Sequence, residues 1–337
     1  MRVRVPLLAP SHSSVLYDAF PREAATAASC RLSAAAGVSA LSTRIAHRLR
    51  SRTVALRARA ASPSASHAKL VVCTTSLNYA DLDERAPTAR KETGMSEIER
   101  ALRIQLAGTY RIFAMLGWTE LIYNHITLRL PGPPTHFLIN PFGLHYTEVT
   151  ASNLVKIDLD GNLVEPSAHR VNPAGFVVHA AIHRALPDAH CVMHTHTTAG
   201  LAVACSEAGL ENTNFYSAQL HGMVAYHDFE GITVHGDEGP RLVAHLGEKR
   251  LMILRNHGLL AVGQTIAQAF ARLWTLNRAC EIQVATASLG RARAIAPDIA
   301  ARCTRDSLQF DPAYGAGQDV LDALLRQIDK IDPSYKE

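Results

Sequence analysis

The segment Cys191–Thr197 carries two histidines at a spacing that suits metal binding. It begins with an apolar run, which predicts a buried strand. Successive side chains of a strand point to opposite faces, so His194 and His196 would project from the same side. Two neutral imidazoles aimed at one point make half of a metal site.

A third candidate ligand, His257, lies 61 residues after His196. The apolar run Leu251–Leu254 predicts a strand that ends just before it, and Gly258 would permit a sharp turn there. Strand ends are where α/β proteins gather catalytic groups. Because the chain has 17 histidines, a chance His-x-His pair is not rare, and such a pair alone is more often part of a core. The added strand-end histidine favours a metal site made of three imidazoles.

The composition narrows the class of protein. Apolar residues make up 47% and charged residues 19%, as in soluble globular domains, and no apolar run is long enough to span a bilayer. The six cysteines are scattered without a Cys-x-x-Cys pair, which argues against a thiolate zinc site and against a disulfide framework. We therefore expect a cytoplasmic protein in a reducing compartment, with no membrane partner and no specific nucleic-acid partner.

Residues 1–94 differ in composition from the remainder. They are rich in Ala, Ser and Arg, and before Asp81 the only acidic residues are Asp18 and Glu23. We expect a disordered extension, because such a segment buries too little apolar surface to fold. It could be an organelle transit peptide or a basic tail that touches nucleic acid or membrane non-specifically. We favour a third interpretation, in which the true protein begins at Met95, at the composition break and directly before a helix signal.

Strands and helices alternate over residues 95–290, which predicts an α/β metal-binding domain. Ser96 and Glu99 fit a capping box at the first helix, and Gly117 would end it. Apolar periods predict helices over 98–116, 173–186, 199–209, 239–247 and 265–289, and strands over 121–130, 136–140, 191–197, 224–226, 232–234 and 251–254. Residues 155–164 are expected to form a hairpin, and residues 291–337 a tail for docking or for oligomer contact.

These motifs resemble the class II aldolase/adducin head-domain family. The likeness rests on His-Thr-His, on Asn-His-Gly 61 residues later, on Tyr123–Thr127 and on the helix that starts at Pro173. It covers residues 95–290 and is closest to the adducin-type bacterial branch. The resemblance implies an α/β/α layered fold with a central, mostly antiparallel sheet, and a homotetramer with the metal near a subunit interface. It also implies a divalent metal on His194, His196 and His257, with Zn²⁺ the default and Mn²⁺, Fe²⁺ or Co²⁺ also suitable.

The chain departs from the sugar-phosphate aldolases that it resembles. Those enzymes have Ser-Ser-Glu just before the helix that precedes His-x-His, and the matching residues here are Pro173, Ala174 and Gly175. The phosphate-binding hydroxyls and the acid/base glutamate are therefore absent. The Thr-Gly of the phosphate loop is replaced by Phe142–Gly143. We expect a substrate without phosphate, partly apolar or aromatic.

Other site residues follow from the same resemblance. Asn124 matches an asparagine that helps to hold phosphate, and we expect it to contact substrate together with Gly143 and Gln219. Tyr216 and His221 lie where the family places an aromatic proton donor, so they are candidates for the acid/base role. In the competing interpretation these residues only line the core or an interface.

Three histidines with an open fourth position make a Lewis acid. Such a site can hold an oxygen of a 2-oxo or 2-hydroxy acid and stabilise the enolate left when a carbon–carbon bond breaks. We therefore expect a metal-dependent lyase of the aldolase or decarboxylase type. One alternative is a non-catalytic interaction domain like the adducin head, which the missing glutamate favours. Another is a non-haem metal oxygenase on the same scaffold. A scaffold protein would have no reason to keep three converging imidazoles.

Overall fold

The computed structural model describes residues 95–133, 135–232 and 236–337. The expectations for residues 1–94 lie outside these ranges, and so does the strand expected over 232–234, apart from Ile232. No helix among the described residues is long and apolar enough to cross a bilayer.

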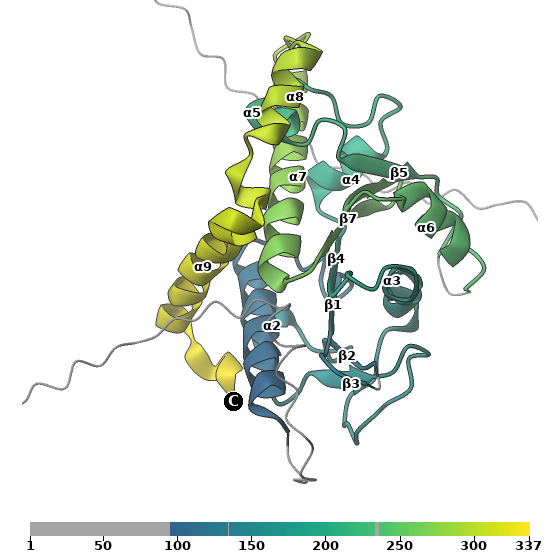
Figure 1. Cartoon of the computed structure of the whole chain (residues 1–337), viewed down its shortest axis with the longest axis vertical. Coiled ribbons are helices and arrows are strands. Elements are labelled where there is room, and N and C mark those ends of the chain that lie inside the picture. The colour runs from purple at the N-terminus through teal and green to yellow at the C-terminus, as the bar shows by residue number, and fades with distance from the viewer. Residues whose placement is uncertain (1–94, 134, 233–235) are drawn as a thin grey trace, which may run out of the picture. The chain divides into compact units, whose positions relative to one another are not determined.

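A seven-stranded sheet forms the centre of the described part of the chain (Figure 1). Its order is β3-β2-β1-β4-β7-β6-β5. Every neighbouring pair is antiparallel except β5 and β6, so the predicted mostly antiparallel sheet is confirmed. The strands are β1 (His125–Arg129), β2 (Phe137–Ile139), β3 (Val155–Ile157), β4 (Cys191–Thr195), β5 (Val224–His227), β6 (Leu251–Leu254) and β7 (Gly258–Gly263).

Helices cover both faces of the sheet. Figure 1 shows the sheet nearly edge-on, with α2 (Glu97–Met115) and α7 (Ile266–Ala287) on one side and α3 (Pro173–Ala185) and α6 (Gly239–Leu246) on the other. One core packs around Phe113 and Phe270 beneath α2 and α7, and a second around Ile182 and Leu242 beneath α3 and α6. The expected α/β/α layering is therefore confirmed. The short helices α4 (Thr198–Ala204) and α5 (Phe215–Gln219) follow β4.

The first helix begins and ends at the expected signals. The Ser96 hydroxyl accepts a hydrogen bond from the Glu99 backbone N–H at 3.0 Å, and Gly117 takes a φ of 74° just beyond the helix. The second half of the expected capping box is missing. The Glu99 carboxylate instead binds Arg103 on the same helix and Lys156 on β3. It ties the start of α2 to the edge of the sheet.

Two strand boundaries differ from the sequence-based prediction. The strand expected from residue 121 begins only at His125, because Glu120 and Leu121 have φ values of 42° and 61°, which no strand residue adopts. The strand β7 was not predicted at all. The sequence interpretation placed Gly258 in a turn, whereas Gly258 opens this strand and pairs with Leu254.

Residues 291–337 are packed against the rest of the described chain. They form α8 (Pro297–Arg305), α9 (Gln318–Ile331) and three short 3-10 turns (Leu308–Phe310, Pro312–Gly317 and Pro333–Lys336), and α9 contacts both α2 and α7. Tyr335 is buried against Gly108 of α2. This region therefore completes the core of the described chain. Contact with a second copy of the chain stays a prediction.

Candidate metal centre and its pocket

The strand β4 carries His194 in its interior and places His196 just beyond its end. In the sheet, His194 lies directly between His125 of β1 and Leu260 of β7. Residues opposite one another on antiparallel strands point to the same face. The row therefore brings a second histidine, His125, beside the first.

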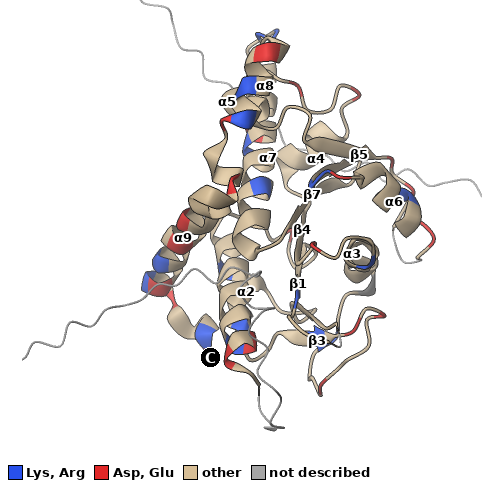
Figure 2. Cartoon of the chain, viewed as in Figure 1, with Lys and Arg blue, Asp and Glu red and all other residues tan. Residues whose placement is uncertain are grey.

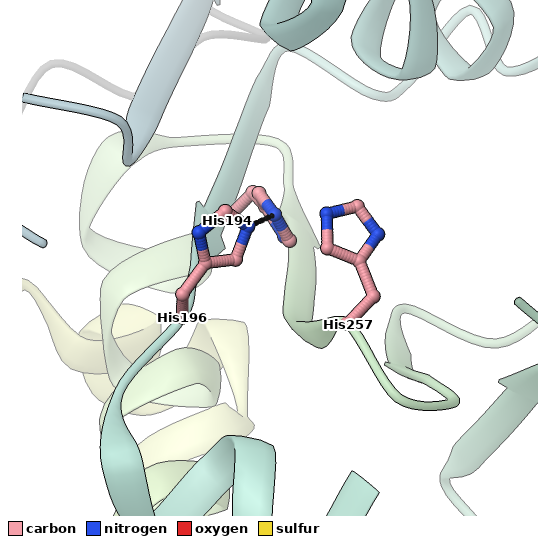
Figure 3. Close-up of side chains that lie close together, drawn as sticks. All are labelled: His194, His196 and His257. Carbon is pink, nitrogen blue, oxygen red and sulfur yellow. Dashed lines mark hydrogen bonds between the residues drawn. The ribbon is translucent and has the colours of Figure 1, made fainter. Parts of the chain in front are cut away.

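The three predicted ligands meet at one point. Their candidate ligand atoms all lie within 4.8 Å of one another. The ring centres are 4.5 Å apart for His194 and His196, 4.8 Å for His194 and His257, and 4.9 Å for His196 and His257. Figure 3 shows the rings of His194 and His196 facing each other, with His257 reaching toward them from the loop after β6.

The loop between β6 and β7 positions His257. Asn256 takes a φ of 55°, in the left-handed region that asparagine tolerates, and the His257 N–H closes the loop on the Leu254 carbonyl. Gly258 is needed for close approach, because a Cβ there would lie 2.4 Å from the Thr195 carbonyl oxygen. The sequence interpretation placed the turn at Gly258, whereas Asn256 makes it. The glycine lets β7 press against β4, and so brings the third ring to the first two.

Hydrogen bonding and burial favour the neutral form of the three triad rings. The Leu259 carbonyl lies 2.9 Å from His194 Nδ1 and can only accept, so this nitrogen donates and Nε2 keeps its lone pair. That Nε2 lies 2.6 Å from Nε2 of His196, so without a metal the His196 nitrogen donates a hydrogen bond to it. Burial lowers the pKa of His194 well below its usual range, the pKa of His196 to about 4, and the pKa of His257. Neutral imidazoles fit a divalent cation, and His194 also has the tautomer that leaves Nε2 free to bind it.

The triad forms part of the wall of a cavity of about 560 Å³. Most of the wall is apolar or aromatic, with Phe142, Phe229 and Ile232 among its residues. Among the described residues that line the cavity there is no Lys, Arg, Asp or Glu. Figure 2 shows that charged residues instead occupy outer helices such as α2, α8 and α9, while β4 and β7 carry none. The polar character of the pocket therefore comes mainly from imidazoles.

Comparison with known proteins identifies the family of this fold and site. The model of the class II aldolase and adducin N-terminal domain matches residues 104–284, more than half of the chain. The chain belongs to this family. The resemblance inferred from the sequence motifs is thereby confirmed.

Three members of the class II aldolase and adducin family illustrate its range. The crystal structure of an aldolase II superfamily protein from Pseudomonas syringae matches this fold with a TM-score of 0.68. The match covers 72% of this chain and 98% of that protein, and the two sequences are 41% identical. L-fuculose 1-phosphate aldolase from Glaciozyma antarctica is 30% identical, with a TM-score of 0.64 over 73% of this chain and 97% of its own. Alpha-adducin of Rattus norvegicus is 42% identical over 250 residues, which are 69% of this chain and 34% of adducin.

Asn124 occupies a buried position behind the class II aldolase-type triad. Its Oδ1 accepts a hydrogen bond from the backbone N–H of His196 at 2.9 Å, and its Nδ2 donates to the Trp118 carbonyl at 2.9 Å. The amide is fully buried and does not line the cavity. It therefore positions His196, and the substrate contact expected from sequence stays a prediction without a direct contact in this structure.

The other predicted site residues lie away from the triad pocket within one chain. Tyr216 and Gln219 line a second cavity, together with Trp274 of α7 and Cys303 of α8. His221 bonds through Nδ1 to the Asn212 side chain and lines neither cavity. Gly143 likewise lies outside the wall, to which its neighbour Phe142 contributes. The acid/base and substrate roles of these residues stay predictions. Within one chain, none of these residues lies at the triad pocket.

The sequence interpretation missed His125. This residue lines the triad pocket, and its ring centre is 5.2 Å from that of His194. Two signals could have found it. It stands next to Asn124 in a motif that carried the family likeness, and it is the inward-facing start of a strand with alternating pattern.

Proposed function

We propose that this protein is a metal-dependent carbon–carbon lyase that acts on a small oxo- or hydroxy-acid without phosphate. The observation that carries the proposal is the convergence of three neutral imidazoles at the wall of a largely apolar pocket. The 30% identity to an L-fuculose 1-phosphate aldolase supports lyase chemistry on this scaffold.

His194, His196 and His257 would hold the metal, for which Zn²⁺ is the default and Mn²⁺, Fe²⁺ or Co²⁺ are alternatives. When bound, the cation would supply a Lewis acid that stabilises negative charge on a substrate oxygen. Three protein ligands leave a coordination position free, as catalytic sites of this kind require. The walls of the pocket would exclude water from the reacting carbons.

The lining of the pocket supports a substrate without phosphate. A phosphate dianion that leaves water needs cationic or strong neutral donors to replace its hydration. The described lining residues include neither Lys nor Arg. Phe142, Phe229 and Ile232 instead offer apolar contact, which suits an aromatic or aliphatic substituent on a compact acid.

An adducin-like interaction role is the second candidate, supported by the 42% identity to alpha-adducin. The two candidates make opposite predictions for the triad. A binding module has no use for three imidazoles that share one cation, whereas a lyase loses its chemistry without them. The homotetramer and the cytoplasmic location expected from the sequence stay predictions.

The decisive experiment combines metal analysis with a substrate screen. Protein loaded with Zn²⁺, Mn²⁺, Fe²⁺ or Co²⁺ is assayed on 2-oxo and 2-hydroxy acids, with and without phosphate, in air and under anaerobic conditions. We expect turnover of non-phosphorylated acids in both atmospheres. His257→Ala should lose metal and turnover, whereas the control His136→Gln, outside the pocket, should keep both.

Three results would contradict the proposal. Unchanged metal content and turnover in His257→Ala would remove the triad from the function. A strict requirement for O₂ would favour an oxygenase, and turnover of phosphorylated sugars alone would overturn the pocket argument.

A further inference from the structure

The short helix α4 connects the two segments that carry His196 and His257. It begins at Thr198, two residues after His196. At its other end, the Ala204 carbonyl accepts a hydrogen bond at about 3.1 Å from the N–H of Asn256, the residue before His257. A shift of α4 would therefore move these two candidate ligands relative to each other.

The residue His196 lies just outside the sheet. The pairing of β4 with β7 ends at Thr195 and Leu259, so His196 follows the last pair of this ladder. Its N–H is held by the Asn124 side chain at 2.9 Å. The next residue, Thr197, is the point at which the chain enters α4. The position of His196 thus depends on what holds Thr197.

The hydroxyl of Thr197 turns away from the helix that it begins. Thr197 is the N-cap residue of α4, where a threonine side chain usually accepts a hydrogen bond from the first turn, yet it makes no such bond. It donates instead to Oδ1 of Asn277 on α7. Gly200 leaves room for this arrangement, because a Cβ there would lie 2.8 Å from the Thr197 hydroxyl oxygen. A bond between two helices replaces the local cap.

The Asn277 side-chain amide has a defined orientation. Its Nδ2 donates at 2.8 Å to Glu281, whose carboxylate can only accept, so Oδ1 is the atom that faces Thr197. The second carboxylate oxygen of Glu281 pairs with Arg278 at 2.7 Å. Asn277 is 1% exposed and Thr197 is 7% exposed. Because breaking a buried bond leaves both groups without a partner, this bond favours one position of α4.

The helix α7 gives this bond a long base. It has 22 residues, and α4 packs between it and β7 (Figure 1). Leu201 of α4 also lines the triad cavity. The start of α4 is therefore fixed to a long helix, while one of its side chains and its far end reach the site.

We propose that Asn277 positions the metal centre by fixing the start of α4 at Thr197. This inference rests on the metal-binding role of the triad in the proposed function. With the bond in place, α4 sets the separation between His196 and the loop that carries His257. Without the bond, the start of α4 can shift, and the two rings lose the spacing that one cation needs. Asn277 does not line the cavity, so it is a positioning residue that acts through Thr197.

The first test removes the Thr197 hydroxyl and measures Zn²⁺ affinity by calorimetry. Thr197→Val keeps the shape of the side chain, and Thr197→Ser keeps the hydroxyl. Thr275→Val is the control, because it removes another buried hydroxyl, whose bond stays within α7. We expect the dissociation constant to rise about 10–100-fold in Thr197→Val and to stay close to wild type in the other two variants. Wild-type affinity in Thr197→Val, or an equal loss in either of the others, would overturn the proposal.

A double variant shows whether Asn277 acts through Thr197. Asn277→Ala alone should also weaken Zn²⁺ binding. If both residues act through one bond, Thr197→Val/Asn277→Ala should lose no more affinity than the more impaired single variant. Losses that add would show that Asn277 acts by another route, which would overturn the proposal.

The absorption spectrum of bound Co²⁺ separates positioning from a general loss of stability. Its d–d bands report the geometry of the ligands around the ion. We expect these bands to change in Thr197→Val and to stay as in wild type in Thr275→Val. Identical spectra for the wild type and Thr197→Val would contradict a role in the spacing of the ligands.

A last readout needs neither metal nor turnover. In metal-free protein, hydrogen exchange of the Asn256 amide reports its bond to the Ala204 carbonyl at the far end of α4. We expect exchange about 5–100-fold faster in Thr197→Val, and at the wild-type rate in Thr275→Val. Unchanged exchange in Thr197→Val would overturn the proposal. If wild-type protein turns over no acid but Zn²⁺ affinity and exchange change as expected, the lyase assignment fails while the positioning role stands.

Discussion

At the scale of single residues, the site depends on imidazoles whose protonation and direction are set by neighbours. The Leu259 carbonyl fixes the tautomer of His194, and the Asn124 amide holds the backbone that carries His196. Neither neighbour touches the cavity. Partners of this kind orient metal ligands, so a change to them should be felt as a change in metal affinity.

We expect Asn124→Ala to weaken Zn²⁺ binding by about 10–100-fold, the usual effect of removing a group that orients a ligand. The His196 N–H and the Trp118 carbonyl would also lose their partner, which costs about 1–3 kcal/mol of unfolding free energy. Calorimetric titration with Zn²⁺ and urea unfolding of the metal-free protein measure the two effects. Asn153→Ala, remote from the triad, serves as the control. Equal Zn²⁺ affinity in both variants would refute the positioning role.

At the scale of elements, the metal centre is a junction between β4 and the β6–β7 hairpin. The ligands come from the end of one strand and from the loop of a hairpin, and their convergence requires β4 and β7 to pair at close range. The register places Thr195 opposite Leu259, directly beside the residues that hold the rings. The site is therefore sensitive to any widening of this pair of strands.

Gly258→Ala should both destabilise the protein and loosen its metal site. The added Cβ would lie 2.4 Å from the Thr195 carbonyl oxygen, so backbone must move. We expect a loss of about 1–3 kcal/mol in unfolding free energy and a rise in the Zn²⁺ dissociation constant. Gly236→Ala is the matched control, because no atom of the described residues lies within 4 Å of its new Cβ. Stability and Zn²⁺ affinity like those of the control would show that the close approach is not needed.

At the scale of the whole molecule, stability is coupled to pH through buried histidines. Burial lowers the pKa of His183 to about 3 from the ordinary value of 6.5 that the unfolded chain retains. Above pH 6.5 both states hold a neutral ring and His183 contributes no pH dependence. Below pH 6.5 the unfolded chain binds a proton that the folded chain refuses until about pH 3, so stability falls across this window.

We therefore expect the unfolding free energy of metal-free protein to fall between pH 7 and pH 5. Each such ring contributes a slope that approaches about 1.4 kcal/mol per pH unit. Urea unfolding with a chelator present measures the curve for the wild type and for His183→Gln. In the variant, the slope of unfolding free energy against pH should correspond to nearly one fewer proton taken up on unfolding, whatever its absolute stability. Parallel curves for the two proteins would show that His183 is not held neutral by the fold.

Much of the site could be predicted because it depends on local pattern. The spacing of His194 and His196 on an apolar strand sets both rings on one face, and Ser96 and Gly117 bound the first helix through bonds to near neighbours in sequence. The third ligand, His257, was found from the apolar run Leu251–Leu254 that ends just before it, and the family likeness pointed to the same residue.

Tertiary structure alone decided which residues share a wall. Strand pairing brought His125 beside His194 and pressed Gly258 onto Thr195, and it left Tyr216 facing a different cavity. Local sequence determines the period and the ends of each element, because those depend on bonds between residues a few positions apart. The walls of a pocket form between segments remote along the chain, whose approach is set by packing of the complete core.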